Sequence, residues 1–331
     1  MFKILRNSLL LCVFAAGAFA ASEENVSRQI EVSPDGKLIV DVDFGSIDIV
    51  SASDDMVSLQ ARRELDVRDE AKEKQYFADA PITLTKEGNV VTVRARNLKS
   101  HGFQNEGHCS MNASYTVRIP KKFETDLQTE GGDISIANLA ANAKAKTSGG
   151  KLIFKQLEGA LTATTRGGPI DMQNCRGSID VETRGGDIKA IDGAGTLHVQ
   201  TEGGRIDVRN FSGDTEARTS GGDVVLERVT GKIVGQTSGG SIRASVAGVV
   251  TGDVDLETSA GNIDLALPTS ATIDVVAHTS IGRVVNRLPL EVSDLGEEHL
   301  RGRMNGGGKS VSLQTSAGNI TIKPGSEIVQ R

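Results

Sequence analysis

Three titratable side chains that recur at every eighteenth position could do acid–base or metal chemistry. They are Asp180, His198 and Glu216. If equivalent positions of this repeat lie side by side in the fold, a histidine lies between two carboxylates, and such a set can move a proton or ligate a metal ion. The same column can instead form a salt-bridge ladder on a solvated surface, because neighbouring carboxylates favour the protonated imidazolium. We predict the surface ladder, because a flat face lacks the concavity of a typical ligand site.

Other motifs of known chemistry are absent from the sequence. It contains no phosphate-binding loop, H-E-x-x-H, C-x-x-C or G-x-S-x-G. The many Gly-Gly pairs do not match the calcium-binding G-G-x-G-x-D repeat, and no helical pattern follows them. His101, His108 and Cys109 are a second set that could bind a metal ion, whereas His278 and His299 form no recognised ligand spacing. We therefore predict no catalytic residue, no cofactor and no metal.

An internal repeat sets the positions of the candidate column. The pattern Thr-x-Gly-Gly returns at every eighteenth position without a slip, at Thr129, Thr147, Thr165, Thr183, Thr201, Thr219 and Thr237. Looser copies follow at Thr258, Thr279 and Thr315. A fixed period of this length is typical of a solenoid, in which each repeat is one coil of a stacked rod.

Each coil contains two short strand patterns. In the coil that begins at Thr165, Ile170 and Met172 form the first apolar pair and Ile179 and Val181 the second. Alternate spacing is typical of strands with one face buried, and glycines separate the strands at both corners. Because one coil cannot bury its apolar face alone, we predict an all-β, parallel β-solenoid of 18-residue coils, each strand pairing with its equivalent one coil away.

The position of a residue within the coil predicts whether it faces inward. The repeated threonines should form a buried or half-buried hydroxyl column at one corner, and Cys175 should be a core thiol. A disulfide between Cys109 and Cys175 is possible in an exported protein, but the inward position of Cys175 argues against it. Outward charges alternate between coils, and opposite charges on neighbouring strands support the register. Two such columns are Asp171, Lys189, Asp207 and Asp187, Arg205, Asp223.

Residues 1–20 have the pattern of a secretory signal peptide. Lys3 and Arg6 precede an apolar stretch, and Ala18-Phe19-Ala20 fits a cleavage site. We predict an exported protein, in the periplasm or at the cell surface, with no integral membrane segment in the mature chain. The formal net charge of −6, with both signs mixed, gives no basic footprint for nucleic acid.

The mature chain is predicted to have two parts. Residues 21–125 form an irregular β-rich part of the solenoid or a cap, with a short helix or lid within 66–80 and a polar loop at 97–113. Residues 126–331 form the repeat region, with an excursion at 284–308. Open solenoid ends need caps, and the two irregular segments are the natural candidates.

Two segments carry a resemblance to a known family. Residues 115–120 (Tyr-Thr-Val-Arg-Ile-Pro), followed by residues 126–134 at the first Thr-x-Gly-Gly, resemble the entry to the repeat in the bacterial putative-adhesin family. These exported proteins of unknown function are similar to the head domains of auto-transporter adhesins. The resemblance implies a right-handed parallel β-solenoid with an envelope or surface role, and it offers no catalytic residues.

These observations together predict a non-enzymatic, adhesin-like structural or binding scaffold. Its partner would be an unknown protein or polymer of the cell envelope or surface. The alternative is a β-helix polysaccharide-degrading enzyme, a lyase or hydrolase, but coils of this length leave little room for loops that form a catalytic groove. Ice binding through the threonine column is disfavoured, because its one threonine per coil should face inward.

Overall fold

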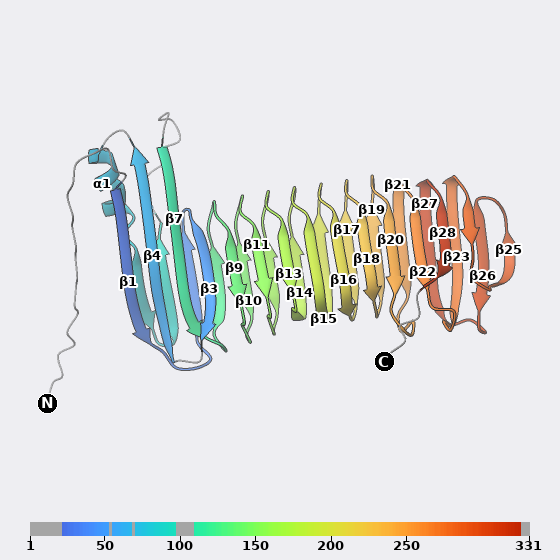
Figure 1. The fold of residues 1–331 in the computed structure, drawn as a ribbon, viewed down its shortest axis with the longest axis horizontal. Helices are drawn as coiled ribbons and strands as arrows, with labels where there is room; N and C mark the ends of the chain where they lie inside the picture. Colours follow the sequence, from blue (N-terminus) through green and yellow to red (C-terminus); the bar gives the residue numbers. More distant parts are fainter. Residues whose placement is uncertain (1–21, 53–54, 68–69, 97–108, 326–331) are drawn as a thin grey trace.

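The computed structural model describes residues 22–52, 55–67, 70–96 and 109–325. Within these ranges the chain forms a long rod of stacked strands with one short helix near its N-terminal end (Figure 1). The predicted signal peptide, His101 and His108 lie outside the described residues, so neither the signal peptide nor the metal site at His101, His108 and Cys109 is tested.

The regular coils extend from β8 to β22. Their strands are β8 (Glu124–Gln128), β9 (Ile134–Ala137), β10 (Ala143–Lys146), β11 (Leu152–Lys155), β12 (Leu161–Thr164), β13 (Ile170–Gln173), β14 (Arg176–Glu182), β15 (Ile188–Thr201), β16 (Ile206–Ser212), β17 (Thr215–Thr219), β18 (Val224–Val229), β19 (Ile233–Thr237), β20 (Ile242–Val246), β21 (Val254–Ala260) and β22 (Ile263–Leu267). They form two parallel ladders. The first ladder is β8, β10, β12, β14, β15, β17, β19 and β21, and the second is β9, β11, β13, β15, β16, β18, β20 and β22.

The register of the ladders confirms the predicted parallel solenoid. Leu152 lies opposite Ile170, and Ile170 lies opposite Ile188, so each residue pairs with its equivalent in the next coil. The two ladders enclose a continuous core, because alternate side chains of each strand point inward and are buried. Cys175 lies in this core as a free thiol, and burial raises its pKa. The expectation that Cys175 is an unpaired core thiol is therefore confirmed.

The threonine column is buried, as predicted, and it joins neighbouring coils. Thr183 is 1% exposed, and its Oγ1 donates to the carbonyl oxygen of Gly168 in the preceding coil at 2.9 Å. The same oxygen accepts a hydrogen bond from the backbone N–H of Gly186 at 3.3 Å. One hydroxyl thus satisfies a buried acceptor and a buried donor of the backbone at the corner.

Replacing Thr183 by valine should lower the free energy of unfolding by about 1–3 kcal/mol, because it leaves both backbone groups buried without a partner. Thr183→Ser keeps the hydroxyl and should cost less than the valine variant. Denaturant unfolding of the two variants and the wild type measures the difference. Equal losses in both variants would show that the methyl group, and not the hydrogen bonds, carries the effect.

The double-glycine corner allows the backbones of adjacent coils to lie in close contact. A methyl group on the second glycine of a pair would lie 1.8 to 2.1 Å from the carbonyl oxygen of the equivalent glycine one coil earlier. These second glycines are Gly150, Gly168, Gly186, Gly204, Gly222 and Gly240. The first glycine of each pair faces open space or ordinary contact distances. The second position of each pair therefore has no room for any side chain, and only glycine fits there.

A second corner column was not predicted. One non-glycine residue in each of several successive coils adopts a φ between 54° and 60°, in the left-handed region. These residues, each at the same place in its coil, are Asn138, Gln156, Asn174, Asp192, Asn210 and Arg228. Asn and Asp tolerate this conformation best, so their return at the period of the repeat is the signal that could have identified the column.

At the N-terminal end, the first coil is interposed between later ones. The elements here are β1 (Ser22–Glu31), β2 (Lys37–Val42), β3 (Ser46–Ala52), β4 (Met56–Val67), α1 (Glu70–Asp79), β5 (Thr83–Glu87), β6 (Val90–Ala95) and β7 (Cys109–Pro120). β2 lies between β6 and β8, and β3 lies between β7 and β9. Antiparallel strands then close this end, β5 on β6, β4 on β7 and β1 on β4.

Two expectations concern this end. α1 lies in the segment for which a short helix is predicted. The polar loop predicted at 97–113 is wrong for its last part, since β7 begins at Cys109. The strand extends there because β4, which is equally long, pairs with β7 from Val67↔Cys109 onward.

A buried arginine anchors β1 at this end. Arg63 on β4 is 0% exposed and lies opposite Glu24 on β1. Its Nε donates to Glu24 Oε2 at 2.9 Å, and its Nη1 donates to the Ala80 carbonyl at 2.7 Å. The guanidinium also lies 5.1 Å from the ring centroid of Phe77 in α1. Burial raises the pKa of the adjacent Tyr115 to about 12, although the charge of Arg63 opposes the shift.

The C-terminal end also has an interposed coil. Its strands are β23 (Ile273–Ile281), β24 (Val284–Asn286), β25 (Glu291–Leu295), β26 (His299–Met304), β27 (Lys309–Ala317) and β28 (Ile320–Pro324). β27 lies between β21 and β23, and β28 lies between β22 and β24. The first ladder then continues with antiparallel β26 and β25, whereas the second ladder ends at β24.

Candidate functional site

The predicted column lies on the outer face of the first ladder. Asp180 on β14 is in register with His198 on β15, and His198 is in register with Glu216 on β17. Alternation along these strands turns all three side chains to solvent while their neighbours fill the core. The fold therefore brings the three residues to adjacent strands.

Contacts within the column are unequal. His198 Nδ1 lies 3.5 Å from Glu216 Oε2, and these side chains are 39% and 36% exposed. Among the described residues, no hydrogen bond or ion pair joins Asp180 to His198, although the two are opposite each other on adjacent strands. Within the described part of the chain, no group of three His, Cys, Asp or Glu side chains is arranged to hold a metal ion. The arrangement is that of a partly solvated contact between an imidazole and a carboxylate.

A chain of polar contacts continues from Glu216 along the ladder. Arg218 contacts Glu216, and its Nε donates to Gln236 Oε1 at 2.8 Å. Gln236 Nε2 then donates to Glu257 Oε2 at 3.4 Å. These residues were not predicted as a site, although Gln200, Arg218 and Gln236 recur with the period of the coil. Their signal is a second outward column, two positions along the strand from the first.

Two shallow hollows follow this face. One has a volume of about 500 Å³ and includes Asp180, His198 and Glu216. The other has a volume of about 320 Å³ and includes Arg218, Gln236 and Glu257. Both involve β15, β17 and β19, so they are successive parts of one surface. We name it the polar groove, defined by Asp180, His198, Glu216, Arg218, Gln236 and Glu257.

On the outer face of the second ladder, charged side chains form ion pairs with one another. Lys151 Nζ lies 2.5 Å from Asp171 Oδ2, and Arg209 Nε lies 2.7 Å from Asp207 Oδ1. In the column next to the double glycine, Asp187 Oδ1 accepts a hydrogen bond from the backbone N–H of Arg205 at 2.8 Å. Asp187 therefore joins two coils by a hydrogen bond to the backbone. The sequence had instead predicted that the side-chain charges of Asp187 and Arg205 attract each other.

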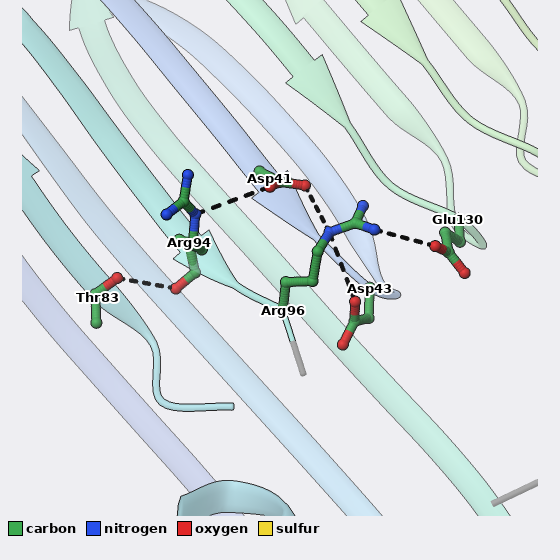
Figure 2. A network of polar contacts seen from close by, with 6 residues as sticks. All are labelled: Asp41, Asp43, Thr83, Arg94, Arg96 and Glu130. Atoms are coloured by element: carbon green, nitrogen blue, oxygen red, sulfur yellow. Dashed lines mark hydrogen bonds and ion pairs between the residues drawn. The ribbon is translucent and has the colours of Figure 1, made fainter. Parts of the chain in front are cut away.

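A second charged cluster surrounds Arg96, directly after β6 (Figure 2). Arg96 Nε lies 2.8 Å from Asp41 Oδ1 and 3.7 Å from Asp43 Oδ1, and Nη1 lies 3.1 Å from Glu130 Oε1. Arg94 Nε lies 3.8 Å from Asp41 Oδ2. Burial alone would lower the pKa of Arg96, but the carboxylates raise it, Asp41 most strongly. The cluster fastens interposed β2 between β6 and the turn after β8, which is a structural role.

The fold and the groove define a class of protein, a β-solenoid rod whose accessible polar sites lie on the outer faces of its ladders. Within this class, the chain belongs to the Toastrack DUF4097 family, whose model matches residues 44–323. This match confirms the resemblance to an adhesin-like family of unknown function. No curated protein matches the sequence.

The solved structures that are similar to the chain include the following three. A putative cell adhesion protein from Clostridium sporogenes is 13% identical, with a TM-score of 0.22, over 91% of this chain and 100% of that one. A putative adhesin from Bacteroides fragilis is 14% identical, with a TM-score of 0.34, over 92% and 100%. A putative lipid binding protein from Parabacteroides distasonis is 12% identical, with a TM-score of 0.33, over 91% and 98%.

No helix in the described ranges is both long enough and apolar enough to cross a bilayer.

Proposed function

We propose that this protein is a non-enzymatic, adhesin-like scaffold, exported to the cell envelope or surface, whose polar groove binds an extended hydrophilic partner. The observation that carries the proposal is the groove, which crosses successive strands of the first ladder. Neighbouring strands lie about 4.8 Å apart, so the groove presents hydrogen-bonding side chains at a regular spacing. Such a row suits a partner that is itself extended, a protein segment or a polymer.

The chemistry of the groove favours recognition by hydrogen bonds and charge. The chain has no Trp and two Tyr, and both tyrosines, Tyr76 and Tyr115, are at most 5% exposed. Stacking platforms for sugar rings, which use exposed aromatic faces, are therefore not supported in the described residues. The contacts from Glu216 through Arg218 and Gln236 to Glu257 hold donors and acceptors in place before a partner binds.

A binding experiment tests the groove directly. Purified protein is applied to a carbohydrate array and to a peptide array, and the best ligand is titrated against variants. Arg218→Ala/Gln236→Ala should weaken binding about tenfold or more, the loss of roughly one to two good polar contacts. Lys189→Ala/Asp207→Ala on the opposite face is the matched control and should bind as the wild type does.

Equal binding by the wild type and the groove variant would contradict the proposal. Cleavage of a polymer that His198→Ala abolishes would favour the alternative of a polysaccharide-degrading enzyme.

Localisation is tested separately with a tag after Arg331. Antibody labelling of intact cells would support surface display and adhesion. Labelling only after the outer membrane is permeabilised would support a periplasmic scaffold, and a tag that stays in the cytoplasm would contradict export.

A further inference from the structure

The last described coil of the chain is not the end coil of the rod. β27–β28 lies between β21–β22 on one side and β23–β24 on the other (Figure 1). Thr315 of this coil is in register with Thr258 on β21 and with Thr279 on β23. The chain therefore leaves one coil position open after β22 and fills it later. We name this position, occupied by residues 309–324, the insertion slot.

The connection from β22 to β23 is also suited to a coil order without the slot. Thr237 and Thr258 are 21 residues apart, and their coils are in direct contact because β19 pairs with β21. Thr258 and Thr279 are again 21 residues apart, but their coils lie two positions apart. The same spacing therefore supports direct stacking one coil earlier, and it allows β23–β24 to stack directly on β21–β22.

The two coils present the same register to the edge of β21–β22. Val311 lies opposite both Val254 and Val275, so direct stacking would bring Val275 opposite Val254. The corner glycines Gly318 and Gly282 are equivalent as well. A methyl group on either would lie 2.0 Å from a carbonyl oxygen of the adjacent coil, so both fit the close contact at this corner.

The buried residues favour the observed order over direct stacking. β27–β28 fills the slot with Leu313 and Ile322, each at most 1% exposed. At the equivalent positions β23–β24 has Ala277 and Asn286. Leucine and isoleucine bury more apolar surface there than alanine and asparagine would, and buried apolar surface stabilises the fold. In the end coil, Asn286 stays partly exposed, and its Oδ1 accepts a hydrogen bond from the backbone N–H of Leu288 at 2.9 Å.

We propose that this end of the rod is a two-state device, in which β23–β24 and β27–β28 compete for the insertion slot. β23–β24 precedes β27–β28 in the chain, so it reaches the edge of β21–β22 first during synthesis. It stacks there provisionally, and residues 309–324 displace it when they follow. The provisional coil covers an open sheet edge that would otherwise pair with other chains.

Disulfide trapping during refolding of the full chain tests the provisional state. In Asp255→Cys/Val276→Cys, the two cysteines lie opposite each other only when β23 pairs directly with β21. In the structure they are two strands apart, about 9.6 Å, which is too far for a disulfide. Oxidant is added at increasing times after dilution from denaturant, and mass spectrometry of peptic fragments identifies the bonds. The bond between these cysteines should form early and be lost at later times.

Two further pairs of cysteines are the controls. Asp255→Cys/Ser312→Cys are opposite each other in the structure, and their bond should appear as the first one is lost. Asp255→Cys/His278→Cys close a loop of nearly the same length, two residues out of register, so they report chance collision in the unfolded chain. Equal early yields from the Val276 and His278 pairs would overturn the proposal.

Weakening one competitor tests the competition itself. Leu313→Ala gives β27 the residue that β23 has at the equivalent position, Ala277. Added to Asp255→Cys/Val276→Cys, it should raise the yield of the trapped bond at equilibrium. Leu161→Ala removes an equally buried leucine of β12, outside the slot, and should not raise it. Circular dichroism checks that both variants fold, and equal yields from the two folded variants would contradict competition for the slot.

Discussion

Gly186→Ala is expected to lower the free energy of unfolding by about 3 kcal/mol or more, or to prevent folding. The added methyl group would lie 2.0 Å from the carbonyl oxygen of Gly168 and 2.4 Å from its carbon. Neither atom can move freely, because both belong to the backbone of the preceding coil. Denaturant unfolding, followed by circular dichroism, measures the loss.

Gly185→Ala is the matched control, one position earlier in the same turn. Its added methyl group would lie 3.8 Å from the nearest heavy atom, the carbonyl oxygen of Arg166. We expect a change within about 1 kcal/mol, since only backbone freedom differs. If both alanine variants were equally stable, close coil-to-coil contact could not be the reason for the second glycine.

Glu24→Ala should lower the free energy of local unfolding at the N-terminal end by about 3 kcal/mol or more, because it leaves the fully buried charge of Arg63 without its carboxylate. The loss should be local, since each coil of a solenoid contacts mainly its neighbours. Hydrogen exchange should therefore become faster in β1 and α1 and stay unchanged in β11 to β19. Mass spectrometry of peptic fragments resolves these segments.

The neighbouring pair supplies the control for this prediction. Glu23 Oε1 lies 3.0 Å from Arg62 Nε, but these side chains are 41% and 56% exposed. Glu23→Ala should therefore cost less than about 1 kcal/mol. Similar rates of hydrogen exchange in the Glu23 and Glu24 variants would mean that the burial of Arg63 does not make its ion pair with Glu24 stronger than an exposed pair.

The regular part of the fold was predictable because one period governs it. Thr-x-Gly-Gly at every eighteenth residue determines the register, and alternation around Ile170 and Ile179 determines which side chains face inward. Because equivalent residues of successive coils pair with each other, the strand positions and the inward-facing residues of one coil predict those of every regular coil. The buried threonines follow from the same argument.

The coil order at both ends could not be predicted, because each interposed coil has nearly the same pattern as its neighbours. Nothing local in residues 37–52 indicates that β2 should pair with β6 and β8 together. Long-range contacts decide the order, such as those of Arg96 with Asp41 and Glu130.

At the candidate site, the column of Asp180, His198 and Glu216 was predictable from its spacing, because the period of the repeat places the three residues on adjacent strands. The extension through Arg218 and Gln236 was not predicted, because their recurrence marks an outward column but not a site. Glutamine and arginine in a repeat do not by themselves indicate a groove, since both are common on any solvated face.

The interposed last coil has a mechanical consequence. A pulling force applied beyond Gly325 acts on β28, which is hydrogen-bonded to β22 on one side and to β24 on the other. Extraction must break both sets of bonds, whereas β1 at the opposite terminus has one described partner and can be peeled from β4. Resistance to force depends on the unfolding rate of the loaded element. The rod should therefore hold a much larger load through its C-terminal attachment than through its N-terminal strand.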